Sequence, residues 1–197
     1  LYASGHPLDD YSLEVKYFCT NQLKDIDLFT SPVRNFSFSG YVQSHTERIS
    51  KNDQPYGILI LEDYSGTREF RLFGDTYIKF RNYFINQSLL FFSASIVKQK
   101  WGNGGLRVNI DNVLLLSSVS DKLINEIVFN IPIDIISPEF IDSIVEIISK
   151  YPGKQNLKFN ILEKDVNLNL LSKKYRVQIC SSLVSDMSVF AINFALK

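Results

Sequence analysis

The feature that most constrains this chain is a long stretch of alternating apolar and polar residues that begins at Phe36 and ends at Leu115. Successive side chains of a β-strand point to opposite faces, so strict alternation predicts half-buried strands. Turn residues divide the stretch into five segments. An apolar pattern with helical spacing interrupts them once, over residues 75–86. The strands are predicted from Phe36 onward and over residues 56–62, 67–73, 89–98 and 106–115.

Three strands, one helix and two strands follow one another in about eighty residues, which is the order of the OB-fold. The OB-fold is a five-stranded Greek-key barrel with a helix after its third strand. The glycine-rich segment Trp101–Gly105 lies where the loop between the last two strands is expected, and its glycines allow positive φ. An SH3-like barrel or part of a β-sandwich shows similar alternation and remains an alternative.

The segments on either side of the predicted barrel do not show this alternation. Residues 1–35 combine short amphipathic stretches with loops, and 117–121 form a polar joint. Beyond the joint we expect a small α+β unit with a strand over 126–133, a helix that begins at Ser137-Pro138, three short strands over 157–163, 166–170 and 175–179, and a last helix over 183–196. The prediction is therefore a helical connector (1–35), an all-β OB-fold domain (36–116) and a C-terminal α+β domain (121–197).

Composition excludes several classes of protein. The 197 residues contain 21 Lys+Arg and 21 Asp+Glu, so no overall electrostatic field attracts the molecule to nucleic acid or to an anionic membrane. Cys19 and Cys180 lie far apart without a CxxC spacing, which indicates neither a disulfide framework nor a zinc site. The longest uncharged apolar stretch, residues 89–97, is too short to cross a bilayer, so we expect no membrane association.

Residues suited to catalysis are sparse. His6 and His45 have no Cys or Ser partner at a recognisable spacing, and no nucleotide-binding or hydrolase motif occurs. The adjacent carboxylates Asp9-Asp10 and Glu62-Asp63 point to opposite faces of an extended chain, which disfavours a shared metal ion. The sequence therefore predicts no catalytic residues, no metal site and no cofactor in this chain.

Residues suited to nucleic-acid binding are more numerous, and they follow the elements that OB-folds use. OB-folds bind oligonucleotides across the second and third strands, between the first and the last strand-connecting loops. Single strands need cations along the phosphates and aromatic rings against the bases. We expect phosphate contacts from Arg48, Lys51, Arg71, Lys98, Lys100 and Arg107, and base stacking from Phe73 and Trp101.

Several motifs resemble one protein family. The opening Tyr2-Ala3-Ser4-Gly5-His6-Pro7-Leu8-Asp9-Asp10-Tyr11 resembles the SGHPLD segment of the bacterial DNA polymerase III alpha subunit. Gly40-Tyr41-Val42 and the segment from Gly57 to Gly66 are similar to the first two OB strands of that family. Glu69-Phe70-Arg71-Leu72-Phe73, followed by Tyr77, resembles its third strand and helix entry. The resemblance covers residues 1–116, and residues 117–197 match the family's small C-terminal domain in layout.

The resemblance implies a non-catalytic, C-terminal fragment of a DNA-directed DNA polymerase, a nucleotidyltransferase of the bacterial cytoplasm. In that family the active site, which is expected to use Mg²⁺, lies in a domain absent from this chain. The resemblance also implies a place in the replisome, with single-stranded template DNA bound by the OB domain. In some relatives the C-terminal domain docks the tau subunit of the clamp loader.

Two further functions remain open at the level of sequence. The neutral charge also suits an OB barrel that serves as a protein-docking module. The anticodon-binding OB domain of an aminoacyl-tRNA synthetase is a third possibility, but that family lacks the SGHPLD opening.

Overall fold

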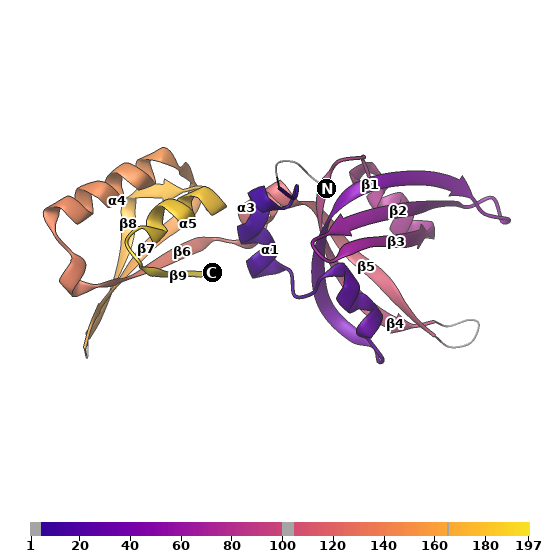
Figure 1. The fold of residues 1–197 in the computed structure, drawn as a ribbon, viewed down its shortest axis with the longest axis horizontal. Helices are drawn as coiled ribbons and strands as arrows, with labels where there is room; N and C mark the ends of the chain where they lie inside the picture. Colours follow the sequence, from indigo (N-terminus) through magenta and orange to yellow (C-terminus); the bar gives the residue numbers. More distant parts are fainter. Residues whose placement is uncertain (1–4, 100–104, 165) are drawn as a thin grey trace. The chain divides into compact units, whose positions relative to one another are not determined.

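The computed structural model describes residues 5–99, 105–164 and 166–197, which form two compact units, 1–117 and 118–197 (Figure 1). The predicted order of three strands, a helix and two strands in the first unit is confirmed. Its helices and strands are α1 (Ser12–Phe18), β1 (Val33–Ile49), β2 (Pro55–Asp63), β3 (Gly66–Phe73), α2 (Gly74–Phe80), β4 (Leu89–Lys98) and β5 (Leu106–Leu115). Short 3-10 turns cover Asp9–Tyr11, Leu23–Leu28 and Arg81–Tyr83.

The five strands form one antiparallel sheet in the order β3-β2-β1-β4-β5. The long strand β1 pairs with β4 through its first half and with β2 through its second half. A register shift between Val42 and Ser44 lies where the strand changes partners. Within the described residues no pairing joins β3 to β5, so the barrel is open along that seam. This is the architecture of the OB-fold, a partly open Greek-key barrel.

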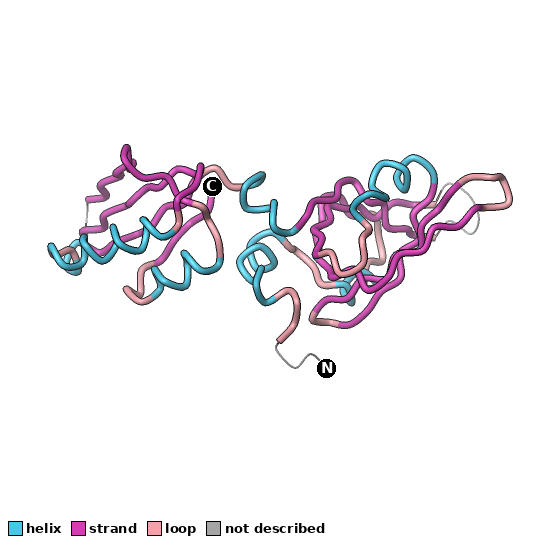
Figure 2. Tube along the Cα trace, turned by 90° about the horizontal axis from the view of Figure 1, so that it is seen from above, coloured by secondary structure: helices cyan, strands magenta, loops and turns pink. Residues whose placement is uncertain are grey.

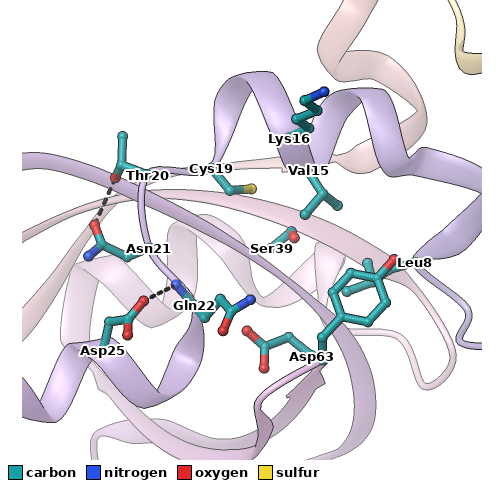
Figure 3. Close-up of a pocket in the computed structure, with 11 residues that line it drawn as sticks. Leu8, Val15, Lys16, Cys19, Thr20, Asn21, Gln22, Asp25, Ser39 and Asp63 are labelled. Carbon is teal, nitrogen blue, oxygen red and sulfur yellow. Dashed lines mark hydrogen bonds between the residues drawn. The ribbon is translucent and has the colours of Figure 1, made fainter.

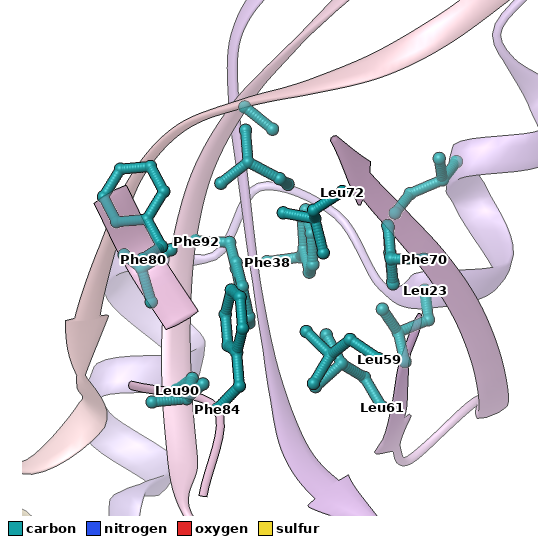
Figure 4. Packing of buried hydrophobic residues seen from close by; sticks show 14 of the residues in the cluster. Leu23, Phe38, Leu59, Leu61, Phe70, Leu72, Phe80, Phe84, Leu90 and Phe92 are labelled. Carbon is teal, nitrogen blue, oxygen red and sulfur yellow. The ribbon is translucent and has the colours of Figure 1, made fainter. Parts of the chain in front are cut away.

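Aromatic rings fill the centre of the barrel (Figure 4). Phe38 of β1 is fully buried, and its ring lies nearly parallel to those of Phe92 (4.9 Å between centroids) and Phe70 (5.4 Å). Three strands thus each contribute a ring to one stack. Offset-stacked rings contribute about 0.5–1.5 kcal/mol per pair beyond the area they bury. The stack therefore ties β3, β1 and β4 together through side chains as well as through the sheet.

The N-terminal connector packs onto the outer side of β1, which makes that part of the strand buried on both faces. Ser37 and Ser39 are buried although the alternation places them on the polar face. Ser37 Oγ donates to the Phe18 carbonyl at 2.5 Å, and the amides of Thr20 and Asn21 donate to the Ser37 carbonyl at 3.0 Å. Buried polar groups need such partners. The serines therefore anchor the connector to the barrel.

Helix α2 covers one end of the barrel and is shorter than the helix predicted over residues 75–86. It ends at Phe80 because the chain must turn back to begin β4. The turn runs through a 3-10 segment and through Gln87, which has a φ of 70°. Tyr77 of α2 is fully buried, and its hydroxyl donates to Glu47 at 2.5 Å and lies 3.1 Å from His45 Nε2.

The second unit is an α+β fold with a four-stranded sheet in the order β8-β7-β6-β9. Strands β6 and β7 are parallel, and α4 connects them. Figure 2 shows the two longer helices, α4 and α5, on the same face of this sheet. The elements are α3 (Val119–Leu123), β6 (Glu126–Pro132), α4 (Pro138–Lys150), β7 (Pro152–Glu163), β8 (Val166–Val177), α5 (Ser181–Ser188) and β9 (Asn193–Leu196).

The beginning of α4 was predictable from the sequence. Ser137 is its N-cap, and the Ser137 hydroxyl accepts a hydrogen bond from the Phe140 amide at 3.2 Å. Pro138 occupies the first helical position, where its missing N–H costs nothing.

Three predictions for the second unit were wrong. The polar joint at 117–121 is helical, since Val119 begins α3 and is fully buried. The strands expected at 166–170 and 175–179 are one strand, β8, whose register shifts against β7. The last helix ends at Ser188, because Ala191 takes a φ of 52° and residues 193–196 pair with β6 as a strand. The alternation over residues 193–196 is too short to predict a strand when the apolar residues before it have helical spacing.

We predict that Gly57→Ala destabilises the first unit. A Cβ at residue 57 would lie 2.3 Å from Cε2 of the buried Tyr77 ring, so α2 must shift to make room. Overpacking of this kind costs about 1–3 kcal/mol. The measurement is urea unfolding followed by circular dichroism. Gly105→Ala is the control, since a Cβ there meets no atom of the described residues within 4 Å. Equal midpoints for both variants would show that the Tyr77 ring does not require Gly57.

Candidate nucleic-acid interface

The outer face of β1, β2 and β3 carries three of the residues predicted from the sequence. The strand register places Arg48 opposite Tyr56, and Tyr56 opposite Phe73, so the three residues form one row across the sheet. Side chains two residues apart on a strand share a face. The next row on this face therefore consists of Thr46, Ile58 and Arg71.

Two aromatic rings dominate this face. The rings of Tyr56 and Phe73 lie 5.1 Å apart at an interplanar angle of 21°, and Phe73 is 57% exposed. An exposed ring held by a second ring is a preformed stacking surface, because its orientation is fixed before any ligand arrives. Tyr56 was not predicted from the sequence. The sequence could have indicated Tyr56 only through its pairing with Phe73. That pairing depends on the length of the turn between β2 and β3.

Arg71 lies next to Phe73 on the same strand, two residues away along the outer face. Its Nε donates to Glu69 Oε1 at 2.7 Å, and this hydrogen bond raises the pKa of the guanidinium above its ordinary value. The pair is largely exposed, so solvent screens it. Glu69 consequently competes with a phosphate for Arg71 and weakens any anion binding at this position.

The open seam between β3 and β5 extends the site. A cavity of about 260 Å³ is lined from both sides of the seam, by Phe73 at the end of β3 and by Arg107 of β5. Asp75, Thr76 and Asn109 also line it. The structure thus brings Phe73 and Arg107 together although 34 positions separate them in the sequence. Polar groups and one cation surround the exposed ring here, while Asp75 adds a negative charge.

The remaining predicted residues lie at the ends of strands or outside the described part. Lys51 is exposed in the β1–β2 turn, three residues beyond Arg48. Lys98 is exposed at the end of β4, where it pairs with Leu106, the neighbour of Arg107. Lys100 and Trp101 lie outside the described residues, so they remain predictions.

A second cavity, of about 250 Å³, lies between the connector and the barrel (Figure 3). Its buried carboxylate, Asp63, accepts hydrogen bonds from the amides of Leu23 and Ser65, both at 2.7 Å. Burial raises the pKa of the Cys19 thiol to about 11, with a smaller contribution from Asp63. A thiol that keeps its proton is a poor nucleophile. The polar groups of this cavity hold the connector in place.

The described residues contain no group of three or more His, Cys, Asp or Glu side chains placed to hold a metal ion. His45 contacts Tyr77 and Phe84, and burial is the main cause that lowers its pKa. The ring of His6 lies 4.6 Å from that of Tyr64, centroid to centroid, and is tilted by 44° against it. Both histidines thus pack against aromatic rings. Within the part of the chain that the structure describes, no helix is long and apolar enough to cross a membrane.

The order and pairing of its strands define the first unit as an OB-fold. Comparison with known proteins then shows which family the chain is similar to. Residues 127–196 match the family model described as DNA polymerase III alpha subunit, C-terminal domain. This match and the relatives below support the resemblance seen in the sequence, that of a C-terminal part of a DNA polymerase III alpha subunit.

Curated relatives match across both units. DNA polymerase III subunit alpha of Pasteurella multocida is 23% identical over 78% of this chain and 13% of its own length. The Pseudomonas aeruginosa subunit is 20% identical over 95% of the chain and 16% of its own length. The chain therefore spans a small part of these relatives. Among solved structures, the second OB-fold domain of replication protein A from Methanococcus maripaludis aligns with a TM-score of 0.27 and 17% identity, over 41% of this chain and 82% of that chain.

We predict that the first unit loses stability between pH 9 and pH 11 because of Cys19. The pKa of its thiol is about 11 in the folded protein, against an ordinary value of 9.0, so the folded state binds more protons in this interval. The stabilisation is complete below pH 9 and is lost as the pH rises through the folded pKa. Urea unfolding at several pH values measures how the free energy of unfolding falls with pH between 9 and 11. The Cys19→Ala variant should show a smaller fall. An identical fall for the variant would contradict the assignment.

Proposed function

We propose that the OB barrel binds single-stranded DNA without sequence preference. The observation that carries this proposal is the exposed Phe73 ring, held against the half-buried Tyr56, with Arg48 in the same row and Arg71 in the next. OB-folds bind single strands on this surface, with aromatic rings against the bases and cations along the phosphates. Every base has a π-face, so stacking on Phe73 does not select a sequence.

The charges on this face imply modest affinity. Arg48, Arg71 and Arg107 supply positive charge near the rings, while Glu69 and Asp75 oppose it. The whole chain has a net charge of zero, so no long-range field adds to the local contacts. Each phosphate contact changes the slope of log K against log[salt] by about −0.7 for a single strand. Three to six contacts therefore give a slope between roughly −2 and −4, with affinity on the order of micromolar at physiological salt.

Within a complete alpha subunit, this barrel would hold template DNA ahead of the active site. The parent would be a DNA-directed DNA polymerase of the bacterial cytoplasm and a member of the replisome, and its Mg²⁺-dependent chemistry would take place in another domain. These statements rest on the family and on the fold of the barrel.

Residues 121–197 are proposed to fold as a separate domain that docks a replisome protein, such as the tau subunit of the clamp loader. Two observations support this proposal. The contacts of the chain separate into two units at residue 117, and the second unit has a hydrophobic core of its own.

We predict that Phe73→Ala weakens binding of a short oligothymidine by about 1–3 kcal/mol, the cost of losing one stacking aromatic ring. Tyr56→Ala should weaken it as well, because Phe73 then loses its supporting ring. Fluorescence anisotropy with a labelled oligonucleotide measures both effects. Ile78→Ala is the control, since Ile78 is 47% exposed on α2 and does not line the seam cavity.

We further predict that Arg71→Ala flattens the salt dependence of binding by less than one unit and changes affinity similarly for every sequence. Lys79→Ala, another exposed cation in the same unit, should leave the slope unchanged. If the parent protein shows no salt-dependent binding, or if the Phe73 and Arg71 variants bind as the parent does, the barrel instead serves as a protein-docking module.

A further inference from the structure

The second unit has an apolar surface that its two longer helices do not fully cover. Ile131 of β6 and Ile161 of β7 face α4, and the register extends their row to Leu168 of β8. Exposure rises along this row, from 3% at Ile131 to 53% at Leu168. The parallel row from Phe129 rises from 1% to 44% at Leu170. The apolar face thus extends beyond the helices, onto the edge strand β8.

A groove follows this uncovered strip. It encloses about 370 Å³ between α4 and the sheet, and its lining is almost entirely apolar. Phe140, Ile141 and Ile144 of α4 form one wall, and Leu170 and Tyr175 of β8 lie on the other side. Ile141 is 51% exposed although it belongs to the apolar stripe of α4. Contiguous exposed apolar surface of this kind is a feature of protein interaction sites.

Charge is distributed unevenly around the groove. Between residues 150 and 176 the sequence has seven Lys or Arg residues and two Asp or Glu residues. In the remaining parts of residues 118–197 the numbers are two and seven. Lys150 at the end of α4 pairs with Glu146 at 3.2 Å, and Lys158 pairs with Glu126 at 2.7 Å. The excess of positive charge thus lies on the rest of the β7–β8 hairpin. Lys173 and Lys174 are exposed on β8, between Ser172 and Tyr175, which both line the groove.

We infer that this groove binds an acidic amphipathic helix of a partner protein, with apolar side chains inserted between α4 and β8 and carboxylates against the basic hairpin. A helix fits because it would lie beside α4 and continue the helical layer over the strip left uncovered on β8. Helix-in-groove recognition uses such an apolar stripe at i, i+3, i+4 and i+7. The inference deepens the docking role proposed for this domain and is independent of DNA binding by the barrel.

The apolar lining separates this partner from a nucleic acid. A DNA strand would engage the lysines of the hairpin but would leave Ile141, Leu168 and Leu170 exposed. An acidic amphipathic helix covers the apolar residues and neutralises the lysines together. Binding of an acidic helix therefore requires Leu168 and Leu170, whereas binding of a DNA strand does not.

The test uses the full chain and a labelled synthetic peptide of about four helical turns, with leucines at the stripe positions and glutamates elsewhere. A second peptide carries lysines in place of the glutamates. Fluorescence anisotropy should show binding of the acidic peptide and at least about tenfold weaker binding of the basic one. This comparison needs no variant. If neither peptide binds, or if both bind equally, the inference is wrong.

Variants locate the binding site. Leu170→Ser should weaken binding of the acidic peptide about tenfold, the effect of losing one buried leucine contact. Leu162→Ser is the matched control, because Leu162 is 37% exposed on the same hairpin but on the opposite face of the sheet. The double variant Lys173→Glu, Lys174→Glu should shift preference towards the basic peptide. Unchanged peptide binding by Leu170→Ser would overturn the proposed location.

Oligothymidine binding, measured on the same samples, reports on the barrel separately. Leu170→Ser should bind oligothymidine as the parent does, whether or not the peptide binds. If oligothymidine displaces the acidic peptide, the hairpin is a nucleic-acid surface and the inference fails. If oligothymidine does not bind while the peptide binds the groove, the DNA-binding function proposed for the barrel is wrong and the inference about the groove is supported.

Discussion

The first unit depends on a single strand that pairs with two partners. β1 pairs with β4 from Val33 to Tyr41 and with β2 from Tyr41 to Ile49, so both halves of the barrel are joined through it. The register shift after Val42 lets the strand bend between the two partners. Phe38, at the centre of the aromatic stack, lies on the same strand. Damage to β1 would therefore separate the two halves as well as empty the core.

The candidate interface follows from this arrangement. Because β1 holds β2 in register and β2 holds β3, Arg48, Tyr56 and Phe73 align in one row. The sheet ends at β3 and at β5 without a pairing between them, and the resulting seam lets Arg107 approach Phe73. An OB barrel thus offers a rigid aromatic surface beside an opening lined by polar groups. The nearby carboxylates of Glu69 and Asp75 keep the positive potential of this face low.

The elements of the fold that depend on neighbouring residues were predictable from the sequence. The alternation of apolar and polar residues predicted the five strands of the barrel, and Ser137-Pro138 predicted the start of α4. The burial of Ser37 was not predictable, because it depends on hydrogen bonds to the distant connector. That Arg48 and Phe73 lie in one row with Tyr56 was not predictable, because this alignment depends on the register between strands. The binding roles assigned to Arg48, Arg71, Phe73 and Arg107 stay predictions. Strand β9 was missed because β6 stabilises it through tertiary pairing, against a helical spacing of its apolar residues.

The measurement that tests the central claim most directly is a map of backbone amide chemical shifts as oligothymidine is added to the full chain. The account predicts that the largest changes fall on the β1–β2–β3 face and its seam, at Arg48, Tyr56, Arg71, Phe73 and Arg107, and diminish as salt is added. Changes confined to the second unit, to α2 or to the connector, or the absence of salt-dependent changes, would contradict the assignment of this face as a DNA-binding surface.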